Sequence, residues 1–517
     1  MSILLPISSK FIHKNYMKIY FSLLLILLLP GTTLSAERET RAYFNEVKNE
    51  PTLLRNFLYK FPKGGDLHNH LNGAIYAESY ISWAADDGKC IDLSTFMVLP
   101  PPCSTDNGKP ALRDIQYSSV MTNSIIDALS VRNYELREVS GHDQFFSTFR
   151  RFLQAGLGHE GHMLAEVSAR AARQNIVYLE LMQSYGMAAA RSIAVNNKDF
   201  ALTVSLSSLV KNPDIEKLAN DTIAELDRIE QQWYEKLACN TPQADPGCDV
   251  PVRYLAQVIR VFPREQVLAQ TLLAFKLIEK DPRYVGLNFV APEDNPVALR
   301  DYHWQMEIIG GLAEHFPSAR RGITLHAGEV VMGLVPPEDL GWHIRDAIQT
   351  AGARRIGHGI DVFYDKEAPQ LLQHMAEEGI MVEINLTSND VILGVKNDEH
   401  PFKAYRKYKV PMAFSTDDEG VSRIDLTHEY QRAVETYGLS YKDLKYYSRN
   451  ALTYSFLAGE SLIDYSRRDG FVSERASSRP GLKPASISCE NYLKENEKAR
   501  WQWDLEKRFK TFENSYN

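Results

Sequence analysis

The chain has 517 residues, of which 44% are hydrophobic and 24% are charged, values typical of a folded globular protein rather than a disordered or membrane-embedded one. The formal net charge of −8 at pH 7 argues against a nucleic-acid partner, because nothing would offset repulsion from the phosphates. At this length the chain can form one large core with insertions or two or more ordinary domains.

The N-terminal segment differs from the rest of the chain. Lys10, Lys14 and Lys18 precede an apolar run of eleven residues at 19–29, and a small residue follows at Ala36. This order predicts a secretory signal peptide, since about 20 apolar residues are needed to span a bilayer. A single membrane anchor is the alternative. We expect cleavage near Ala36 and export to a periplasm or out of the cell. The mature chain would then contain 55 basic and 66 acidic residues.

Short apolar runs rich in β-branched residues then alternate with amphipathic stretches of helical period. The runs predicted as strands are 64–70, 175–182, 252–260, 284–291, 322–328, 354–360, 380–386 and 410–418. Helical patterns lie between them, for example at 264–280 and 368–379. Eight strands that alternate with helices predict an α/β fold, a (β/α)8 TIM-type barrel with a parallel sheet.

Long segments follow the first two predicted strands, at 71–174 and 183–251, and we expect insertions around one barrel rather than separate domains. The tail from residue 490 is charged and aromatic, and we expect a C-terminal capping helix. The predicted division is a signal peptide at 1–36, a helical lead-in at 37–62, the barrel at 63–465 and a C-terminal extension at 466–517.

Each insertion contains two cysteines that flank a short loop, which fits an exported protein. The suspected disulfides are Cys90–Cys103 and Cys239–Cys248, with Cys489 outside both, although spacing alone does not prove this connectivity. The chain has no C-x-x-C pair, so neither a zinc ribbon nor a cysteine-ligated base deaminase is expected.

The first insertion ends in an aromatic stretch of helical spacing. Its rings, Phe145, Phe146 and Phe149, could cover a pocket as a lid or simply pack the helix against the barrel. The sequence leaves both readings open. The neighbouring His142 is expected at the surface rather than as a metal ligand.

Chemically active side chains gather at the predicted strand ends. His68 and His70 end the first strand and, two residues apart, would share one face. The others are His326 and Glu329 at the fifth strand, His358 at the sixth, and Asp417 and Asp418 at the eighth. Because carboxyl ends of barrel strands meet at the active site, we expect these residues to converge. Three histidines and an aspartate suit Zn²⁺ with room for a water, whose pKa the ion lowers towards about 7.

The same stretches resemble the ordered motifs of the adenosine deaminase family of the amidohydrolase superfamily. They are DLHNHLNGA, TLHAGE, RIGHGI and STDDEG, followed by YSRNALTYSFL. The resemblance covers about residues 60–460, and its nearest branches are the exported bacterial-type enzymes and the growth-factor-like enzymes. It implies hydrolysis of adenosine or 2′-deoxyadenosine to inosine or 2′-deoxyinosine and ammonia, by attack of a metal-bound hydroxide at purine C6.

The resemblance also implies roles for single residues. One zinc ion per chain would be bound by His68, His70, His326 and Asp417. Glu329 would protonate purine N1, while His358, held by Glu383, would orient the hydroxide and pass a proton with Asp417 to the leaving amine. The substrate contacts would be Asn72 at the ribose 5′-hydroxyl, Gly73, Ala291, and Asp418 near N7.

Three positions depart from the family pattern and bear on the substrate rather than the reaction. Asn72 stands where the family has aspartate, and Asn288 and Ala291 stand where it has aspartate and glycine. Two alternatives therefore stay open: a deaminase of another 6-aminopurine, N6-modified or phosphorylated, and an exported nucleoside-binding protein without turnover. The intact Glu329 argues against the second, because binding alone needs no proton donor. We expect a small purine nucleoside as partner, no nucleic acid and no stable membrane anchor after cleavage, while the sequence leaves the oligomeric state open.

Overall fold

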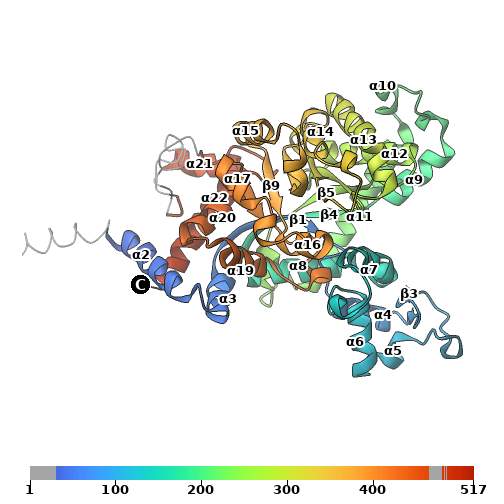
Figure 1. Cartoon of the computed structure of the whole chain (residues 1–517), viewed down its shortest axis with the longest axis horizontal. Helices are drawn as coiled ribbons and strands as arrows, with labels where there is room; N and C mark the ends of the chain where they lie inside the picture. The colour runs from blue at the N-terminus through green and yellow to red at the C-terminus, as the bar shows by residue number, and fades with distance from the viewer. Residues whose placement is uncertain (1–30, 465–479, 483, 485, 517) are drawn as a thin grey trace, which may run out of the picture.

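The structure is a computed structural model in which residues 31–464, 480–482, 484 and 486–516 are described (Figure 1). Most of the predicted signal peptide, residues 1–30, lies outside the described residues, as does the start of the predicted C-terminal extension.

Eight parallel strands form a ring and confirm the predicted barrel (Figure 1). They are β1 (Lys63–His70), β4 (Ile176–Gln183), β5 (Val252–Ile259), β6 (Tyr284–Val290), β7 (Thr324–Ala327), β8 (Arg355–His358), β9 (Met381–Ile384) and β10 (Met412–Phe414). Four strands pair in the order β1-β4-β5-β6 and four in the order β10-β9-β8-β7. Parallel bridges between Asn69 and Asp417 and between Leu287 and Ile323 close the ring.

The strands from β7 to β10 are shorter than the sequence predicted, and in β7, β8 and β10 the backbone turns away at or just after the motif residues. The φ angles of Gly328, His358 and Asp417 are 76°, 67° and 60°. A residue in this left-handed region cannot continue a β-ladder. The motif side chains therefore lie on the turns at the strand ends rather than within long strands.

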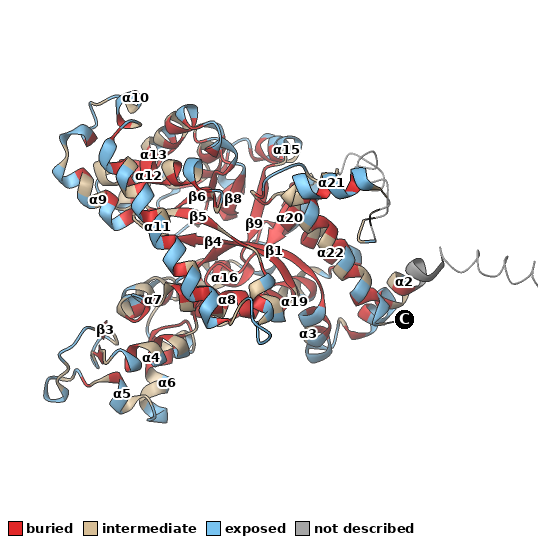
Figure 2. Cartoon of the chain, turned by 180° about the vertical axis from the view of Figure 1, so that it is seen from behind, coloured by how far each residue is buried: buried red, intermediate tan, exposed pale blue. Residues whose placement is uncertain are grey.

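Helices cover the outside of the ring, and the strands inside it are almost wholly buried (Figure 2). The helices that precede the next strand of the barrel, or follow the last one, are α8 (Glu160–Arg173), α11 (Pro213–Lys236), α12 (Arg264–Lys280), α13 (Pro296–His315), α14 (His343–Gln349), α15 (Ala368–Glu378), α17 (Phe402–Tyr408) and α20 (Tyr441–Thr453). The remaining helices of the barrel are α16 (Leu386–Leu393), after β9, and α18 (Glu419–Ser422) and α19 (Leu426–Tyr437), after β10. Alternation of strand and helix along the chain thus gives the layers that the sequence predicted.

The two insertions lie where the sequence placed them, after β1 and after β4. The first contains α4 (Ala77–Asp86), β2 (Cys90–Ile91), β3 (Val98–Leu99), α5 (Leu112–Ile115), α6 (Ser119–Ala128) and α7 (Gly141–Gly156). The second contains α9 (Met187–Asn196), α10 (Leu206–Leu209) and α11. In Figure 1 the segment from α4 to α6 projects from the barrel. Both suspected disulfides, Cys90–Cys103 and Cys239–Cys248, are present, one in each insertion.

Helices from both ends of the chain close the amino end of the barrel. They are α2 (Gly31–Val47), α3 (Pro51–Lys60), α21 (Ile487–Glu495) and α22 (Glu497–Asn514). The tail was expected as one capping helix but is two, because the chain leaves helical geometry at Asn496. On α22, Arg508 contacts Asn175 just before β4, and the rings of Phe61 and Phe509 lie 5.5 Å apart.

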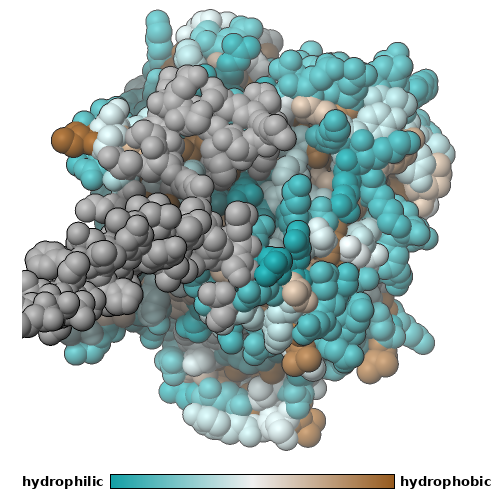
Figure 3. Space-filling model, turned by 90° about the vertical axis from the view of Figure 1, so that its left-hand side faces the viewer, coloured by the Kyte–Doolittle hydropathy of each residue, from teal (hydrophilic) through white to brown (hydrophobic). Residues whose placement is uncertain are grey.

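Viewed from the side on which α2 lies in Figure 1, the described surface is mainly hydrophilic, with small scattered hydrophobic areas (Figure 3). Within the described part of the chain, no helix has both the length and the apolar character that crossing a bilayer requires.

Candidate metal centre and active site

The predicted ligand and catalytic side chains converge at the carboxyl end of the barrel. His68 and His70 come from β1, His326 from β7, His358 from β8, and Asp417 from the turn after β10. The ring of His326 lies 4.6 Å from that of His68 and 5.2 Å from those of His70 and His358, measured between centroids. All five side chains are buried. Five side chains from four strands therefore share one small volume.

Asp417 lies at the centre of this cluster. Its Oδ1 is 3.2 Å from Nε2 of His68 and 3.3 Å from Nε2 of His70, and the latter atom is 3.3 Å from Nε2 of His326. Among the described residues, two sets of possible metal ligands have donor atoms within 4.8 Å of one another: His68, His326, His358 and Asp417, and His70, Asp417 and Asp418. Asp417 belongs to both sets.

The other ring nitrogen of each predicted histidine ligand faces an oxygen atom. The contacts are His68 Nδ1 to Glu383 Oε2 at 2.6 Å, His70 Nδ1 to Gln257 Oε1 at 2.8 Å, and His326 Nδ1 to Asn288 Oδ1 at 2.9 Å. Carboxylate and amide oxygens accept hydrogen bonds, so each Nδ1 carries the proton and each Nε2 presents a lone pair to the cluster. This is the arrangement that metal-binding histidines adopt.

A metal ion fits this donor set. Two Nε2 lone pairs that face each other at 3.3 Å repel, and a cation between them removes the repulsion. The buried Nε2 of His68 has no hydrogen-bond partner among the described residues. Imidazole nitrogens with one carboxylate oxygen are a common donor set for zinc.

Glu383 lies directly below the cluster and is fully buried. Its Oε1 accepts hydrogen bonds from Thr324 at 2.8 Å and from Arg355 at 2.7 Å. Burial alone would raise the pKa of Glu383, but the charge of Arg355 and the contact with His68 lower it to about 2. An ionised carboxylate therefore holds His68.

The sequence analysis expected Glu383 to hold His358, and in the structure it holds His68 instead. Strand register explains the difference, because Gly357 of β8 lies opposite Glu383 of β9. A Cβ on Gly357 would come within 2.7 Å of the His68 ring. The missing side chain thus leaves the space in which Glu383 and His68 meet. His358 accepts instead from Asn389 Nδ2, 2.8 Å from its Nδ1.

Glu329 follows β7 and lies against the metal-ligand cluster. Burial, then the charges of Asp417 and Glu293, raise the pKa of Glu329 well above its usual range, which favours the protonated carboxyl. Its Oε1 lies 3.4 Å from Nδ1 of His358. Burial lowers the pKa of His358 to about 4, so this ring is neutral at pH 7. The site therefore pairs a carboxyl of raised pKa with a neutral imidazole.

A second buried carboxylate fixes the turn that carries Glu329. Glu293 accepts the backbone N–H of Gly328 at 2.9 Å and that of Glu329 at 2.8 Å, and lies 2.6 Å from Nδ1 of His343. Burial would raise the pKa of Glu293, but His343, the charge of Arg260 and the Gly328 N–H lower it to about 2. The ionised carboxylate positions the Glu329 backbone and, through its charge, helps to raise the pKa of the Glu329 side chain.

A pocket of about 310 Å³ opens beside the cluster. Its polar residues are His70, Gln257, His326, Glu329, Asp417 and Asp418, and its apolar residues are Phe145, Phe146, Phe149, Ile259, Val290, Ala291, Pro292 and Ile392. The lining contains no lysine or arginine among the residues that the structure describes. The pocket thus combines apolar side chains with a few polar and titratable ones, as small-molecule sites do.

The phenylalanines of α7 both line this pocket and pack against the hydrophobic core, so covering and packing are combined in one helix. His142 on the same helix lies 3.1 Å from Oδ1 of Asp294, in the loop after β6. It is outside the metal-ligand cluster, as expected. The His142–Asp294 pair joins the helix on one side of the pocket to the loop on another.

The four predicted substrate residues do not all reach the pocket. Ala291 and Asp418 line it, and the buried Oδ1 of Asp418 has no hydrogen-bond partner among the described residues. Gly73 lies behind Asp418, since a Cβ on Gly73 would be 1.5 Å from that oxygen. Asn72 is exposed and lines a separate cavity of about 40 Å³ with Tyr80 and others. Since β1 ends at His70 and the chain then turns, the alternation that aligns residues 68 and 70 does not extend to 72.

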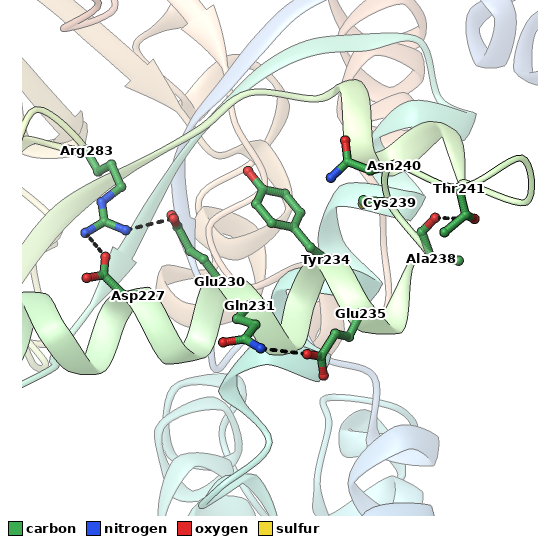
Figure 4. A pocket seen from close by; sticks show the side chains of 10 residues that line it. All are labelled: Asp227, Glu230, Gln231, Tyr234, Glu235, Ala238, Cys239, Asn240, Thr241 and Arg283. Carbon is green, nitrogen blue, oxygen red and sulfur yellow. Dashed lines mark hydrogen bonds and ion pairs between the residues drawn. The ribbon is translucent and has the colours of Figure 1, made fainter.

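A larger groove of about 620 Å³ lies away from this chemistry (Figure 4). It is formed by α11, the loop of the second disulfide and Arg283, which directly precedes β6. It therefore lies towards the amino end of the barrel. Its charged side chains contact each other, with Arg283 2.7 Å from Asp227 and 2.8 Å from Glu230.

Several site residues were missed by the sequence analysis. Gln257 lies near the end of β5 and could have been found by the same strand-end rule that identified the histidines. Asn389 and Ile392 lie on α16, after β9, and no pattern in the sequence distinguished them. Asn288 was noted as a departure from the family, but its contact with His326 was not foreseen.

The chain is similar in sequence to known adenosine deaminases. Residues 162–462 match the family model described as adenosine deaminase. A curated adenosine deaminase of Clostridium perfringens is 33% identical over 187 residues, which are 36% of this chain and 52% of that protein. The adenosine deaminase of Pectobacterium atrosepticum is 36% identical over 167 residues, 32% of this chain and 46% of that protein. The chain thus matches about half the length of these curated relatives.

A solved structure, the Arabidopsis N6-mAMP deaminase, superposes with a TM-score of 0.50 and 21% identity. The superposition covers 78% of this chain and 96% of that one. At this identity the likeness shows a shared barrel fold, and a fold of this kind supports many reactions.

Proposed function

The chain belongs to the adenosine deaminase family, and from this premise we propose that it is a zinc-dependent hydrolase that converts adenosine or 2′-deoxyadenosine to the inosine form and releases ammonia. Its metal, its activity and its substrate are proposals for this chain, because the matched segment is about half of each curated relative.

One observation carries the proposal: a buried carboxyl of raised pKa, Glu329, lines one pocket together with a cluster of candidate metal-ligand atoms. Displacing ammonia from a purine ring by water is slow, because the attack at C6 breaks aromaticity. Protonation of the adjacent N1 makes C6 electrophilic, and a carboxyl with a raised pKa can donate that proton at neutral pH.

The other residues have roles that fit the same reaction. A bound zinc ion would supply a water of lowered pKa as the nucleophile. His358 is neutral and lies beside the cluster, where it would orient such a water and could accept a proton from it. Asp418 lines the pocket, its buried Oδ1 has no hydrogen-bond partner among the described residues, and its carboxyl would bind the purine near N7. The phenylalanines of α7 exclude water from the ring.

The pocket lining favours a neutral nucleoside over a phosphorylated one. A 5′-phosphate carries about two negative charges at pH 7, and no described lining residue is a lysine or arginine to bind them. The Arabidopsis protein that shares the fold is named for a phosphorylated substrate, but that likeness extends to the fold alone.

The test is ammonia release by the zinc-loaded protein from adenosine, 2′-deoxyadenosine, AMP, adenine and N6-methyladenosine. We expect kcat/KM for adenosine to exceed that for AMP by about 10- to 100-fold, the effect of one or two missing charge-assisted hydrogen bonds. Faster turnover of AMP would identify a nucleotide deaminase instead. Binding of adenosine without ammonia release would support the nucleoside-binding alternative.

We also propose that the protein is exported, with cleavage near Ala36. Two disulfides support this, because such bonds persist in oxidising compartments. The cut would fall within α2, and the chain from Glu37 onward keeps its contact with Lys445 at 3.4 Å. N-terminal sequencing of the mature protein should begin near Glu37 in the periplasmic or extracellular fraction. A cytoplasmic protein that starts at Met1 would contradict export.

A further inference from the structure

Two of the three predicted histidine ligands are held by neutral amides rather than by carboxylates. His326 faces Asn288 and His70 faces Gln257, at 2.9 Å and 2.8 Å, whereas only His68 faces an ionised group, Glu383. In all three contacts an oxygen atom faces Nδ1 of the histidine, but only the oxygen of Glu383 belongs to a charged group.

Asn288 is fixed in its orientation by two donors. It lies on β6, beside β7, and is fully buried. Its Oδ1 accepts from both the ring Nδ1 and the backbone N–H of His326, at 2.9 Å and 3.1 Å. Its Nδ2 has no hydrogen-bond partner among the described residues. Because both groups of His326 are donors, the amide oxygen faces them. The buried Nδ2 is left without a hydrogen bond in this orientation.

Gln257 is fixed by a different neighbour. Its Nε2 donates to Oγ of Ser184 at 3.2 Å, and the same hydroxyl donates to the backbone oxygen of Gln257 at 3.0 Å. Ser184 directly follows β4. With the amide nitrogen directed at Ser184, the amide oxygen faces Nδ1 of His70.

The charge of such a partner changes the metal. A carboxylate that accepts from Nδ1 increases the electron density of the imidazole and binds the cation more tightly, whereas an amide oxygen fixes the same tautomer without adding charge. We propose that Asn288 and Gln257 are positioning residues that orient His326 and His70 for the metal while keeping negative charge away from it, and so set the zinc affinity of the site. This inference rests on the zinc site of the proposed function.

The test measures zinc affinity by competition with a chelator, with no need for turnover. Asn288→Leu and Gln257→Leu remove the acceptors and should each weaken zinc binding by about 10- to 100-fold. Asn288→Asp keeps the shape, adds a charge and should tighten binding by about tenfold. Gln305→Leu is the matched control, because Gln305 is also a buried amide but donates to the backbone oxygen of Arg260. Its zinc affinity should equal that of the wild type.

Wild-type affinity in both leucine variants, or no tightening in Asn288→Asp, would overturn the inference. The melting temperature of each metal-free variant separates loss of metal from loss of fold, and Asn288→Asp remains decisive if a leucine variant does not fold. A wild-type protein that binds zinc and deaminates adenosine, with no change in these variants, contradicts this inference alone. A wild-type protein that binds no zinc contradicts both this inference and the proposed function.

Discussion

Replacing Glu329 by glutamine is expected to lower kcat for adenosine by about 10²- to 10⁴-fold, the usual contribution of a general acid. Glutamine has nearly the same shape and can donate a hydrogen bond to N1, but it cannot release a proton to it. The contacts of Glu293 with the turn are to backbone N–H groups, so they persist in the variant. Initial rates of ammonia release, measured at saturating adenosine, provide the check.

The same carboxyl gives the wild type a pH dependence of known sign. Because its pKa is raised and its protonated form is the active one, kcat should fall as pH rises through that pKa, and Glu329→Gln should lose this limb. Zinc content and binding of the product inosine serve as controls and should stay at wild-type values. A variant that keeps a tenth or more of the wild-type kcat would show that another group protonates the ring.

Replacing His326 by alanine is expected to abolish both zinc binding and activity. Its Nε2 faces that of His70 at 3.3 Å, and its ring lies 4.6 Å from that of His68, so the variant loses the ligand on β7. We expect zinc affinity to fall by more than about 100-fold, beyond the effect of losing a partner that only orients a ligand. Metal analysis of the purified variant, with its turnover of adenosine, tests this.

His142→Ala is the matched control for the zinc measurement. His142 is a histidine near the same pocket, but it pairs with Asp294 and lies outside the cluster. It should bind zinc at wild-type stoichiometry. Zinc retained at one ion per chain in His326→Ala would mean that the metal is bound elsewhere.

Much of the site could be predicted because the barrel brings residues from strand ends that are distant in sequence to one place. Each of His68, His326 and His358 ends an apolar run, and in a barrel the ends of parallel strands meet. The sequence thus contained both the ligand types and the rule that brings them together. The disulfides were equally local, since each joins two cysteines across one short loop.

What could not be predicted depends on contacts between strands. Which histidine Glu383 holds is decided by the register of β8 and β9 and by the space left at Gly357. The place of Asn72 depends on the turn that follows β1, because the alternation of side chains ends with the strand at His70. Gln257 and Asn288 read as ordinary strand residues until the strands beside them are known. Periodicity describes one strand at a time and contains none of this information.

The closed amino end of the barrel limits how small molecules can enter and leave the pocket. Below the metal ligands the described interior is filled by side chains such as Tyr178, Glu180 and Arg355, all fully buried, and α22 lies across the strand starts beyond them. The pocket beside the cluster, lined by α7 and the loop after β6, therefore does not continue through the barrel to its amino end. In the proposed reaction, ammonia and the inosine product would therefore have to leave on the same side of the barrel, because the described interior on the other side is filled by side chains.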